Sequence, residues 1–385
     1  MATLSSLLII AVVLVENSVF AQRPPISCRG PDDELVDWFI IGKTPFTNLM
    51  TGRSFVYMDN NHIEFVLAET EIDDKLTPFA RTLERVYENS EDPEFAYVMY
   101  NDAIPDTITP NDSAKFSKFK EVPESQTQFN HHRLFGHSKG VLAADPFSGF
   151  WLSHSVPKFP PRVVDGYSFT SNGIRYAQQM FCQSFTTMSL ADIAAQFRWN
   201  FPQVYDSHLP EFMETLLPEL RQVIDHVPNV TPPGISVIDL TTFGGMKVTN
   251  FAKSYIWNQS LYSALISKHL NTNLRVQTWQ NGAGGRMISY CQPEYENFVE
   301  NIVQISLGQD LDGNEFLYNS TQDHSKWAIS VDSEDSESQS IGWVCIGDVN
   351  RMESQFKRGG GSTCVYHEEI WKAFSQLPFQ IEHCA

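Results

Sequence analysis

The sequence is poor in positive charge and in the motifs by which proteins usually hold metal ions or nucleotides. It has 27 Lys and Arg residues against 46 Asp and Glu, a formal net charge of -19. It contains no H-E-x-x-H segment, no EF-hand loop and no Walker motif. None of its six cysteines forms a C-x-x-C pair, which argues against a zinc site. We therefore expect no resident metal ion and no cofactor.

Long apolar runs are also missing after the first 21 residues. A membrane-spanning helix needs roughly 20 consecutive apolar residues, and no later segment approaches that length. Residues 7–15 (LLIIAVVLV), followed by a small residue at Ala21, are typical of a secretory signal peptide, although the flank before them has no Lys or Arg. We expect residues 1–21 to be removed and the mature form to stay off the membrane.

Two further features agree with export. Six cysteines behind a signal peptide suggest up to three disulfides, whose pairing the count leaves open. Four N-x-[ST] sequons are candidate glycosylation sites: Asn111, Asn229, Asn258 and Asn319.

The acidic balance of charge disfavours a polyanionic partner at neutral pH, but the 11 histidines gain positive charge in mild acid and lower that repulsion. The same acidity also suits any soluble exported protein.

The apolar pattern mixes helix and strand signals, which predicts an α/β or α+β fold with a sheet flanked by helices. Short buried strands are expected at residues 55–58, 96–100, 141–143 and 343–346, and helices at 76–87, 189–198 and 207–227, the last interrupted by Pro210 and Pro218. Residues 228–234 (PNVTPPG) predict a linker between two halves. Residues 332–338 and 359–361 are expected in solvated loops.

One short motif occurs twice. HSKGVLAAD begins at His137 and HSKWAISVD begins at His324, and these are the only two H-x-K triplets. They lie about half the mature length apart, and each precedes a strand with a Gly-aromatic start, GFWLSHSVP from Gly149 and GWVCIGDVN from Gly342. This pattern predicts a duplicated half-domain with a site on a pseudo-twofold axis.

The chemistry of the paired motifs suits a phosphodiester. Side chains at i and i+2 of a strand share one face, so His137 lies with Lys139 and His324 lies with Lys326. Two lysines can bind the non-bridging oxygens of a phosphate. One imidazole can attack phosphorus, and the other can protonate the leaving oxygen.

Two alternatives belong to other classes. Residues 136–140 (GHSKG) also fit the nucleophile elbow of a serine hydrolase, with Ser138 as nucleophile. That elbow needs a strand before the serine and a helix after it; the preceding FNHHRLF is a poor buried strand, and the second H-S-K motif stays unexplained. The other alternative is a secreted binding or effector protein of the same fold with little turnover, against which the two intact motifs argue.

The segments GHSKGVLAAD, GFWLSHSVPKFPP and DHSKWAIS resemble the deoxyribonuclease II family within the phospholipase D-like superfamily. CRGPDDELVDWFIIGKTP from Cys28, YAQQMFCQSF around Cys182 and GWVCIGDVNR from Gly342 extend the resemblance over almost the whole mature chain. It implies two phospholipase D-like halves about a pseudo-twofold axis, each a mixed sheet flanked by helices. The N-terminal half would be residues 22–228 and the C-terminal half residues 229–385, with one motif in each.

The resemblance also implies an activity: metal-independent cleavage of double-stranded DNA at acid pH with little sequence preference, through a phosphohistidine, leaving 3′-phosphate and 5′-hydroxyl ends. The setting would be the lysosome or the extracellular space. His137, Lys139, His324 and Lys326 would be catalytic, with His137 as nucleophile and His324 as general acid or the reverse, and His154 is a secondary candidate. The family's disulfides would pair Cys28 with Cys182, Cys291 with Cys384, and Cys345 with Cys364.

The chain departs from the wider superfamily in one respect. In the superfamily, four residues separate the motif lysine from an acidic residue. This chain has Ala144 and Val331 at the two positions of that acid, and Asp145 and Asp332 come one residue later. The carboxylate that would orient the imidazole therefore stays open. Some relatives lose a catalytic histidine, but this chain keeps both. Candidate cations for guiding DNA are Arg133, Lys158, Arg162 and Arg286.

Overall fold

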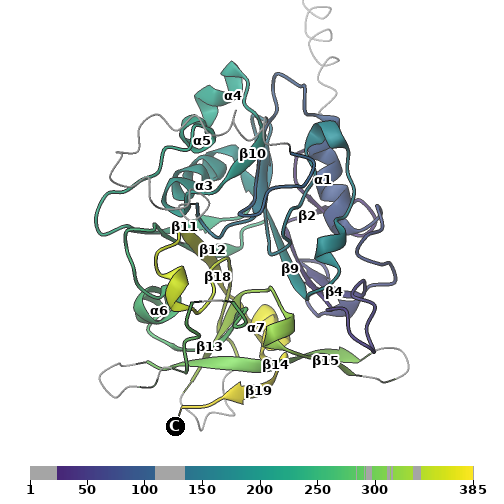
Figure 1. Cartoon of the computed structure of the whole chain (residues 1–385). Helices are drawn as coiled ribbons and strands as arrows, with labels where there is room; N and C mark the ends of the chain where they lie inside the picture. The colour runs from purple at the N-terminus through teal and green to yellow at the C-terminus, as the bar shows by residue number, and fades with distance from the viewer. Residues whose placement is uncertain are drawn as a thin grey trace, which may run out of the picture.

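The chain folds into an α+β structure of two large sheets and a few helices (Figure 1). The computed structural model describes residues 24–108, 135–282, 284–289, 291, 297–309, 313, 315–332 and 340–384. The expected signal peptide, Asn111, Arg133 and most of the acidic segment 332–338 lie outside these residues. No helix within the described ranges is long and apolar enough to cross a membrane.

The first sheet has the strand order β10-β6-β7-β8-β9-β3-β4-β5, and its neighbouring strands pair antiparallel. Its strands are β3 (Trp38–Lys43), β4 (Phe55–Asp59), β5 (Val66–Leu67), β6 (Ala96–Tyr100), β7 (Gly140–Ala144), β8 (Ser148–His154), β9 (Gln178–Thr186) and β10 (Val204–His208). A small sheet of β1 (Cys28–Arg29) and β2 (Leu35–Val36) precedes it.

The second sheet has the order β11-β12-β18-β17-β16-β13-β14-β15, with β19 also paired to β14. Here β13 and β14 run parallel, whereas the other pairs are antiparallel. Its strands are β11 (Ile235–Thr241), β12 (Lys247–Lys253), β13 (Asn273–Gln277), β14 (Val299–Gln309), β15 (Glu315–Asn319), β16 (Trp327–Val331), β17 (Trp343–Gly347), β18 (Gly360–Tyr366) and β19 (Pro378–Glu382).

Five strands of each sheet share one topology. The orders β6-β7-β8-β9-β3 and β13-β16-β17-β18-β12 match position by position, and the strand that comes first in the chain lies at the same end of each set. An H-S-K motif immediately precedes the second strand of both orders, β7 in one and β16 in the other. Equivalent positions in the two halves can therefore be read directly from the strand registers.

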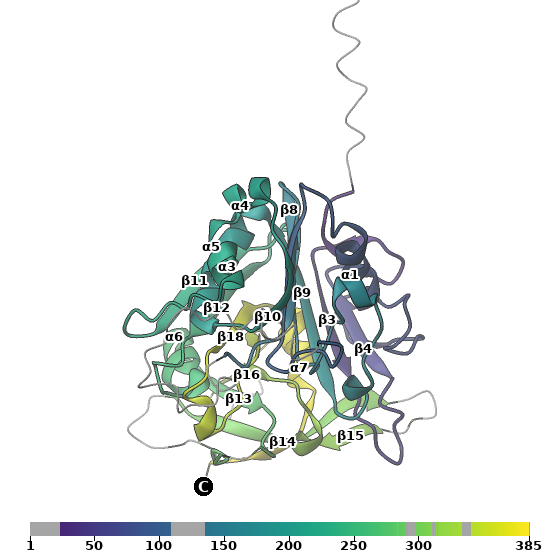
Figure 2. The same ribbon diagram turned by 45° about the horizontal axis from the view of Figure 1, so that its top comes forward.

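Helices cover both faces of the first sheet. In two views α1 (Pro78–Glu88) lies on one side of this sheet and α3 (Thr187–Asn200) on the other (Figures 1 and 2). The other helices among the described residues are α4 (Glu211–Leu216), α5 (Pro218–Ile224), η5 (Tyr262–Ile266), α6 (Ser267–Leu270), α7 (Glu368–Ser375) and the short turns η3 (Val163–Asp165), η4 (Ser171–Gly173), η6 (Ser320–Gln322) and η7 (Glu353–Gln355).

The largest apolar core lies between the two sheets. It joins Leu142 and Phe181 of the first sheet to Val344 and Ile346 of the second, and all four are buried. Separate apolar clusters fill the outer face of each sheet. Because burial of apolar area dominates folding, this shared core fixes the two sheets against each other.

Most expected elements are present. The four predicted strands are found as β4, β6, β7 and β17, and the first two predicted helices as α1 and α3. The third helix prediction, residues 207–227, was wrong at its start, because Ser207 and His208 belong to β10. Its remainder is two helices, α4 and α5, divided at Leu217 before Pro218, as expected for a proline that cannot donate an interior helical hydrogen bond.

The glycines at residues 359–361 were wrongly assigned to a solvated turn. All three are buried, and Gly360 begins β18. A Cβ atom on Gly359 would lie 2.1 Å from the carbonyl oxygen of Asn200, and one on Gly361 would lie 2.3 Å from that of Phe251. The glycines are there because other backbone segments approach closely, which local composition does not reveal.

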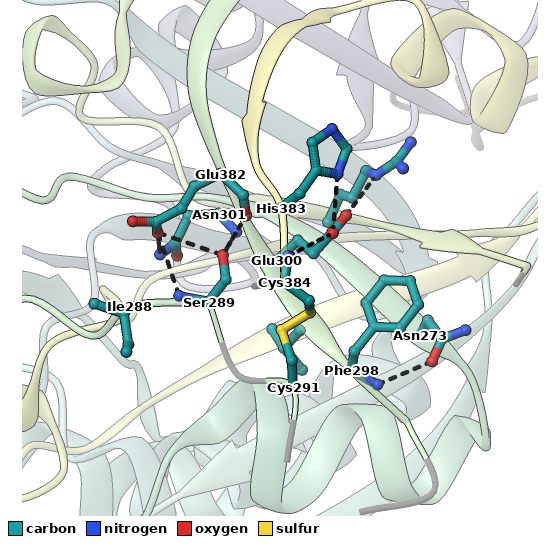
Figure 3. The surroundings of a disulfide bond; sticks show 12 residues. Asn273, Ile288, Ser289, Cys291, Phe298, Glu300, Asn301, Glu382, His383 and Cys384 are labelled. Carbon is teal, nitrogen blue, oxygen red and sulfur yellow. Dashed lines mark hydrogen bonds and ion pairs between the residues drawn. A yellow bond between two sulfur atoms is a disulfide. The ribbon is translucent and has the colours of Figure 1, made fainter. Parts of the chain in front are cut away.

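Three disulfides are present, with the pairing that the family resemblance implied. Cys28 to Cys182 joins β1 to β9, and Cys345 to Cys364 joins β17 to β18. Cys291 to Cys384 ties the segment before β14 to the C-terminal end, where Glu300 accepts hydrogen bonds near His383 (Figure 3). Disulfides of this kind indicate an oxidising compartment. Of the described sequons, Asn258 and Asn319 are exposed and Asn229 is half-buried.

Candidate active site

Each H-S-K motif is held by the opposite half of the molecule. The amide of His137 donates to the carbonyl of Gly359 (2.9 Å), and the amide of His324 donates to the carbonyl of Ala177 (2.9 Å). Ala177 immediately precedes β9 and Gly359 immediately precedes β18, which are equivalent strands. The two bonds are therefore related by the pseudo-twofold symmetry, and they place both motifs at the junction of the halves.

Gln179 of β9 adds a contact that the second half does not repeat. Its side-chain nitrogen donates to the carbonyls of Lys326 (3.0 Å) and Gly347 (3.1 Å), and its side-chain oxygen accepts from the amide of Lys326 (3.0 Å). The residue of β18 that is equivalent to Gln179 is Gly361, as the strand registers show, and it has no side chain to contact the first motif. A buried amide with all these partners satisfied fixes the backbone of the second motif against the first sheet.

The two lysines are nearly inaccessible, with 4% of Lys139 and 3% of Lys326 exposed. Their charges act across the junction. Lys326 contributes to lowering the pKa of His137, and Lys139 contributes to lowering the pKa of His324, in both cases after burial as the larger cause. The structure thus places all four predicted residues at the junction of the two halves.

The surroundings of His137 fix which ring nitrogen is available. Its Nδ1 lies 2.7 Å from the backbone carbonyl oxygen of Asp348. A carbonyl can only accept, so Nδ1 carries the hydrogen and Nε2 of the neutral ring has the lone pair. Burial, with the charge of Lys139 next, keeps the pKa of this histidine well below its usual range. Burial thus favours the neutral form of His137, which is the form that a nucleophile needs.

A carboxylate stands beside that lone pair. Asp102, two residues after β6, is bound by the Lys139 ammonium, lies 3.3 Å from Arg358 Nη2 and lies 3.5 Å from His137 Nε2. Burial raises the pKa of Asp102, but its cationic neighbours, with the Lys139 ammonium first and Arg358 after it, outweigh burial and hold that pKa well below its usual range. Asp102 is thus an ionised carboxylate inside the group.

His324 has an aromatic environment instead. Its ring stacks on Tyr176 with a centroid separation of 4.4 Å and meets Trp279 edge-on at 4.5 Å. Burial, followed by the charges of Lys326 and Lys139, lowers its pKa to about 3. The ring is therefore neutral in the free protein in mild acid, and only a nearby anion can raise its pKa towards the range of a working general acid.

Two further groups titrate near neutral pH. Burial, with the charge of Lys139 next, lowers the pKa of Lys326 to about 7. Burial also raises the pKa of Asp348 to about 7, against the opposing charges of Lys139 and Lys326. Below pH 7 the group thus contains a charged Lys326 and a neutral Asp348, both of which favour an anionic ligand.

The family model described as Deoxyribonuclease II matches residues 27–384. The chain belongs to the deoxyribonuclease II family. It is 32% identical to Plancitoxin-1 of Acanthaster planci, over all of this chain and 98% of the relative. It is 34% identical to Deoxyribonuclease-2 of Caenorhabditis elegans (93% of this chain, 94% of the relative) and 32% identical to Deoxyribonuclease-2-alpha of Mus musculus (98% and 97%). A yeast tyrosyl-DNA phosphodiesterase structure is similar over 60% of this chain and 67% of its own, with a TM-score of 0.31 and 9% identity.

The secondary candidate His154, singled out by the likeness to deoxyribonuclease II, lies directly behind the first motif. Its amide donates to the carbonyl of Lys139 (3.1 Å), and its Nδ1 accepts from the amide of Val156 (3.2 Å). The ring is buried, and Nε2 has no hydrogen-bond partner among the described residues. Burial lowers its pKa to about 3. The backbone of His154 is therefore hydrogen-bonded to Lys139 of the first motif, and burial favours the neutral form of its ring.

The two carboxylates that end the repeated motif do not reach the histidines. Asp145 follows the far end of β7, where its side chain accepts from the amides of Phe147 and Ser148 in the turn to β8. Asp332 likewise follows the far end of β16. Strands rise about 3.3 Å per residue, so neither carboxylate can orient the imidazole of its own motif. In this member of the deoxyribonuclease II family Asp102 takes the position beside His137.

The serine-hydrolase elbow is not formed. Strand β7, not a helix, follows Ser138, and no strand immediately precedes this serine in the described segment that starts at residue 135. Only 2% of Ser138 is exposed. A nucleophilic serine needs an exposed hydroxyl on a strand-to-helix turn, so the geometry is wrong for that reaction.

Three of the four cations suggested for guiding DNA are in ion pairs, and the fourth, Arg133, lies outside the described residues. Lys158 pairs with Asp106 (2.5 Å), Arg162 with Asp165 (3.0 Å) and Arg286 with Glu382 (2.7 Å). Paired surface charges attract an anion less than free ones do. Within the described residues no three His, Cys, Asp or Glu side chains are grouped closely enough to hold a metal ion.

The site contains residues that the sequence did not single out. Asp102 follows a predicted strand, a weak signal that gains meaning only once β6 is known to pair with β7. Arg358 lies next to the glycines that were assigned to a loop. The remaining ones are Gln179, Tyr176, Trp279 and Asp348. Tyr176, Gln179 and Asp348 stand in segments that carry the family resemblance, but no sequence pattern assigned any of the four a role in the site.

Proposed function

We propose that this protein is an acid endodeoxyribonuclease that hydrolyses double-stranded DNA without a metal ion, leaving 3′-phosphate and 5′-hydroxyl ends. The observation that carries the proposal is the placement of both H-S-K motifs at the junction of the halves, where the backbone of each motif is hydrogen-bonded to the other half. Family membership supports DNA as the substrate, since relatives with about a third of their residues in common are named deoxyribonucleases.

In the first step Nε2 of His137 attacks phosphorus. Its lone pair is available because Nδ1 donates to the Asp348 carbonyl, and the ring stays neutral in acid. The bond from phosphorus to the 5′ oxygen breaks, and that oxygen takes the proton of His324. The 3′ side of the DNA then remains on His137 as a phosphohistidine. The ammoniums of Lys139 and Lys326 stabilise the charge on the non-bridging oxygens.

In the second step His324, now neutral, removes a proton from water. The resulting nucleophile attacks phosphorus, and the phosphorus–nitrogen bond breaks. This step releases a 3′-phosphate and restores His137. His324 thus acts first as acid and then as base. A bound phosphate beside its ring raises the pKa from the low value of the free protein, so the substrate itself charges the acid.

Backbone chemistry of this kind gives little sequence preference, because phosphates carry no base information. The three disulfides indicate an oxidising compartment. We propose entry to the secretory pathway through the N-terminal segment and action in the lysosome or outside the cell. The mature form would then act free of the membrane.

A plasmid-nicking assay near pH 5 with excess chelator tests the proposal. The wild-type protein should convert supercoiled DNA to open circles, and His137→Ala and His324→Ala should each lose at least roughly 100-fold in rate. His62→Ala is the matched control, because its side chain is 64% exposed and lies on the β4 turn outside the site.

The outcomes separate the classes of function. Wild-type binding of DNA without nicking at any acid pH would favour the effector alternative. Nicking that the chelator abolishes would contradict a metal-free reaction. Full activity in either site variant would contradict the assigned roles.

A further inference from the structure

Asp102 is surrounded by the groups that the proposed reaction needs for phosphate. One carboxylate oxygen is bound by the Lys139 ammonium, and the other faces Arg358 Nη2 at 3.3 Å and His137 Nε2 at 3.5 Å. All four side chains are at most one-fifth exposed. A carboxylate opposite an imidazole lone pair is not a stabilising contact, so the two cations hold it there.

The geometry of these contacts matches an anionic oxygen of a substrate phosphate. The Asp102 carboxylate lies within reach of two cations, Lys139 and Arg358, and beside the His137 nitrogen that would attack phosphorus. Building on the proposed function, we propose that Asp102 occupies the subsite for the scissile phosphate, that Arg358 is a third phosphate-binding cation of this subsite, and that DNA enters it only by displacing Asp102.

The pseudo-twofold symmetry provides an internal comparison. The residue equivalent to Asp102, two positions after β13, is Trp279, and the residue equivalent to Arg358, two positions before β9, is Tyr176. The second H-S-K motif is thus built without either charge. The carboxylate and the guanidinium occur together in one half and are both replaced in the other, which fits one asymmetric phosphate subsite and not a scaffold that every motif requires.

Arg358 is held in place for this role from the opposite half. Its Nε lies 3.3 Å from the carbonyl of Phe135 and its Nη2 lies 3.3 Å from that of Gly136, directly before the first motif. Its own carbonyl accepts from the buried ammonium of Lys253 (2.5 Å). A guanidinium pre-positioned in this way binds phosphate oxygens with little loss of side-chain freedom.

Displacement couples phosphate binding to protons. When Lys139 and Arg358 turn to the phosphate, Asp102 loses the charges that hold its pKa down, while burial and the new anion both raise it. Asp102 then takes up a proton more readily, so acid favours the exchange. The other charged or titratable groups whose fields meet Asp102 come from the segments before β7 and β16 and from the ends of β8 and β17: His137, His324, Lys326, His154 and Asp348.

Binding of inorganic phosphate to the full-length mature protein tests the proposal independently of turnover. Asp102→Asn keeps the shape but removes the competing charge. At pH 7 it should bind phosphate roughly tenfold more tightly than wild type, which corresponds to about 1.4 kcal/mol. Asp165→Asn is the matched control, because Asp165 also pairs with an arginine (3.0 Å) but lies outside the site; it should leave the affinity unchanged. If Asp102 only positions Lys139 and His137, Asp102→Asn will bind phosphate equally or more weakly.

The arginine is tested in the same titration. Arg358→Ala should weaken phosphate binding roughly tenfold, and Arg358→Lys should restore part of the loss, since lysine keeps the charge but not the planar fork. Arg162→Lys serves as the control for a surface guanidinium. Unchanged affinity in Arg358→Ala would overturn the assignment of Arg358.

A structure with tungstate, a phosphate analogue, covers the case in which Asp102→Asn does not fold. In the wild-type protein the anion should lie between Lys139 and Arg358 with the Asp102 side chain turned away. Tungstate bound elsewhere, with Asp102 still on Lys139, would overturn the proposal. Failure of this inference is distinct from failure of the proposed function. If the wild-type protein nicks DNA, but the Asp102 and Arg358 variants leave phosphate affinity unchanged and tungstate does not displace Asp102, only the inference is contradicted. If the wild-type protein does not nick DNA, the proposed function is contradicted.

Discussion

Two histidines in identical tripeptides have different surroundings in this protein. The ring of His137 is bonded to a carbonyl and faces Asp102 and, beyond it, Arg358. The ring of His324 lies between Tyr176 and Trp279. Because a nucleophile needs a fixed lone pair and an acid needs a pKa that the substrate can raise, these surroundings favour His137 as nucleophile and His324 as acid.

The pH dependence of substrate binding follows from Lys326 and Asp348. Both have a pKa of about 7, lowered for the lysine and raised for the carboxyl by burial. As the pH rises through 7, Lys326 loses its positive charge and Asp348 gains a negative one, so the site becomes more negative by up to two charges. We therefore expect these two titrations to raise KM for DNA above pH 7 by up to roughly a hundredfold per pH unit.

The variant Asp348→Asn isolates one of the two titrations. It keeps the backbone carbonyl that accepts from His137 and removes the carboxyl group, so the rise of KM above pH 7 should fall to roughly tenfold per pH unit. The measurement is KM against pH from initial nicking rates, with Asp165→Asn as the control that keeps the steeper rise. A steep rise that persists in Asp348→Asn would show that other groups set the alkaline limb.

At this scale the sequence predicts the repeated residues but not their partners. The duplicated H-S-K motif can be found in the sequence because both copies consist of the same three residues. Asp102 is not visible, because it becomes a neighbour of His137 only through the pairing of β6 with β7. The superfamily pattern places an acid at position 144, where this chain has Ala144, and the side chain of the next residue, Asp145, closes the turn before β8.

At the scale of elements, the start of β18 is as important as the motif strands. Gly359 accepts from the amide of His137 (2.9 Å) and packs against the end of α3 without a side chain. A Cβ there would lie 2.1 Å from the Asn200 carbonyl oxygen. The backbone that positions the first motif therefore depends on a glycine in the other half.

The substitution Gly359→Ala should destabilise the protein and reduce nicking together. Overpacking of this kind costs about 1–3 kcal/mol, and more where backbone must move. Urea unfolding measures the loss. Gly282→Ala is the control, because the nearest atom to its added Cβ is the flexible Met352 sulfur at 3.2 Å. Wild-type stability in Gly359→Ala would contradict the close approach.

Short buried strands were predictable, but the boundary between neighbouring elements was not always so. Residues 55–58 and 96–100 are apolar runs with polar flanks, and each is a strand as expected. Ser207 and His208 carry no apolar side chain, and their strand conformation comes from pairing with Val98 and Tyr97 of β6. Tertiary pairing of this kind overrides local propensity.

For the whole molecule, the disulfides differ in the length of chain that they close. Cys28 and Cys182 are 154 residues apart, whereas Cys345 and Cys364 are 19 apart and already face each other on paired strands. Chain-entropy arguments give about 5 kcal/mol for the longer loop and about 3 kcal/mol for the shorter one. We therefore expect the double variant Cys28→Ala/Cys182→Ala to lose more stability than Cys345→Ala/Cys364→Ala.

Thermal unfolding of the two double variants at one pH checks this order. The shared core between the sheets predicts a single transition in each, because neither sheet buries its inner face without the other. Two separate transitions, or the greater loss in the shorter loop, would contradict this view of the molecule.

The proposed two-motif reaction is tested most directly by trapping the covalent intermediate. DNA is mixed with the protein near pH 5, and the reaction is quenched in alkaline denaturant, which preserves phosphohistidine. The protein is then digested, and its peptides are identified by mass spectrometry. We predict a 3′-phosphoryl-DNA adduct on the peptide that contains His137, absent in His137→Asn. Turnover without any adduct on a histidine of either motif would contradict the account.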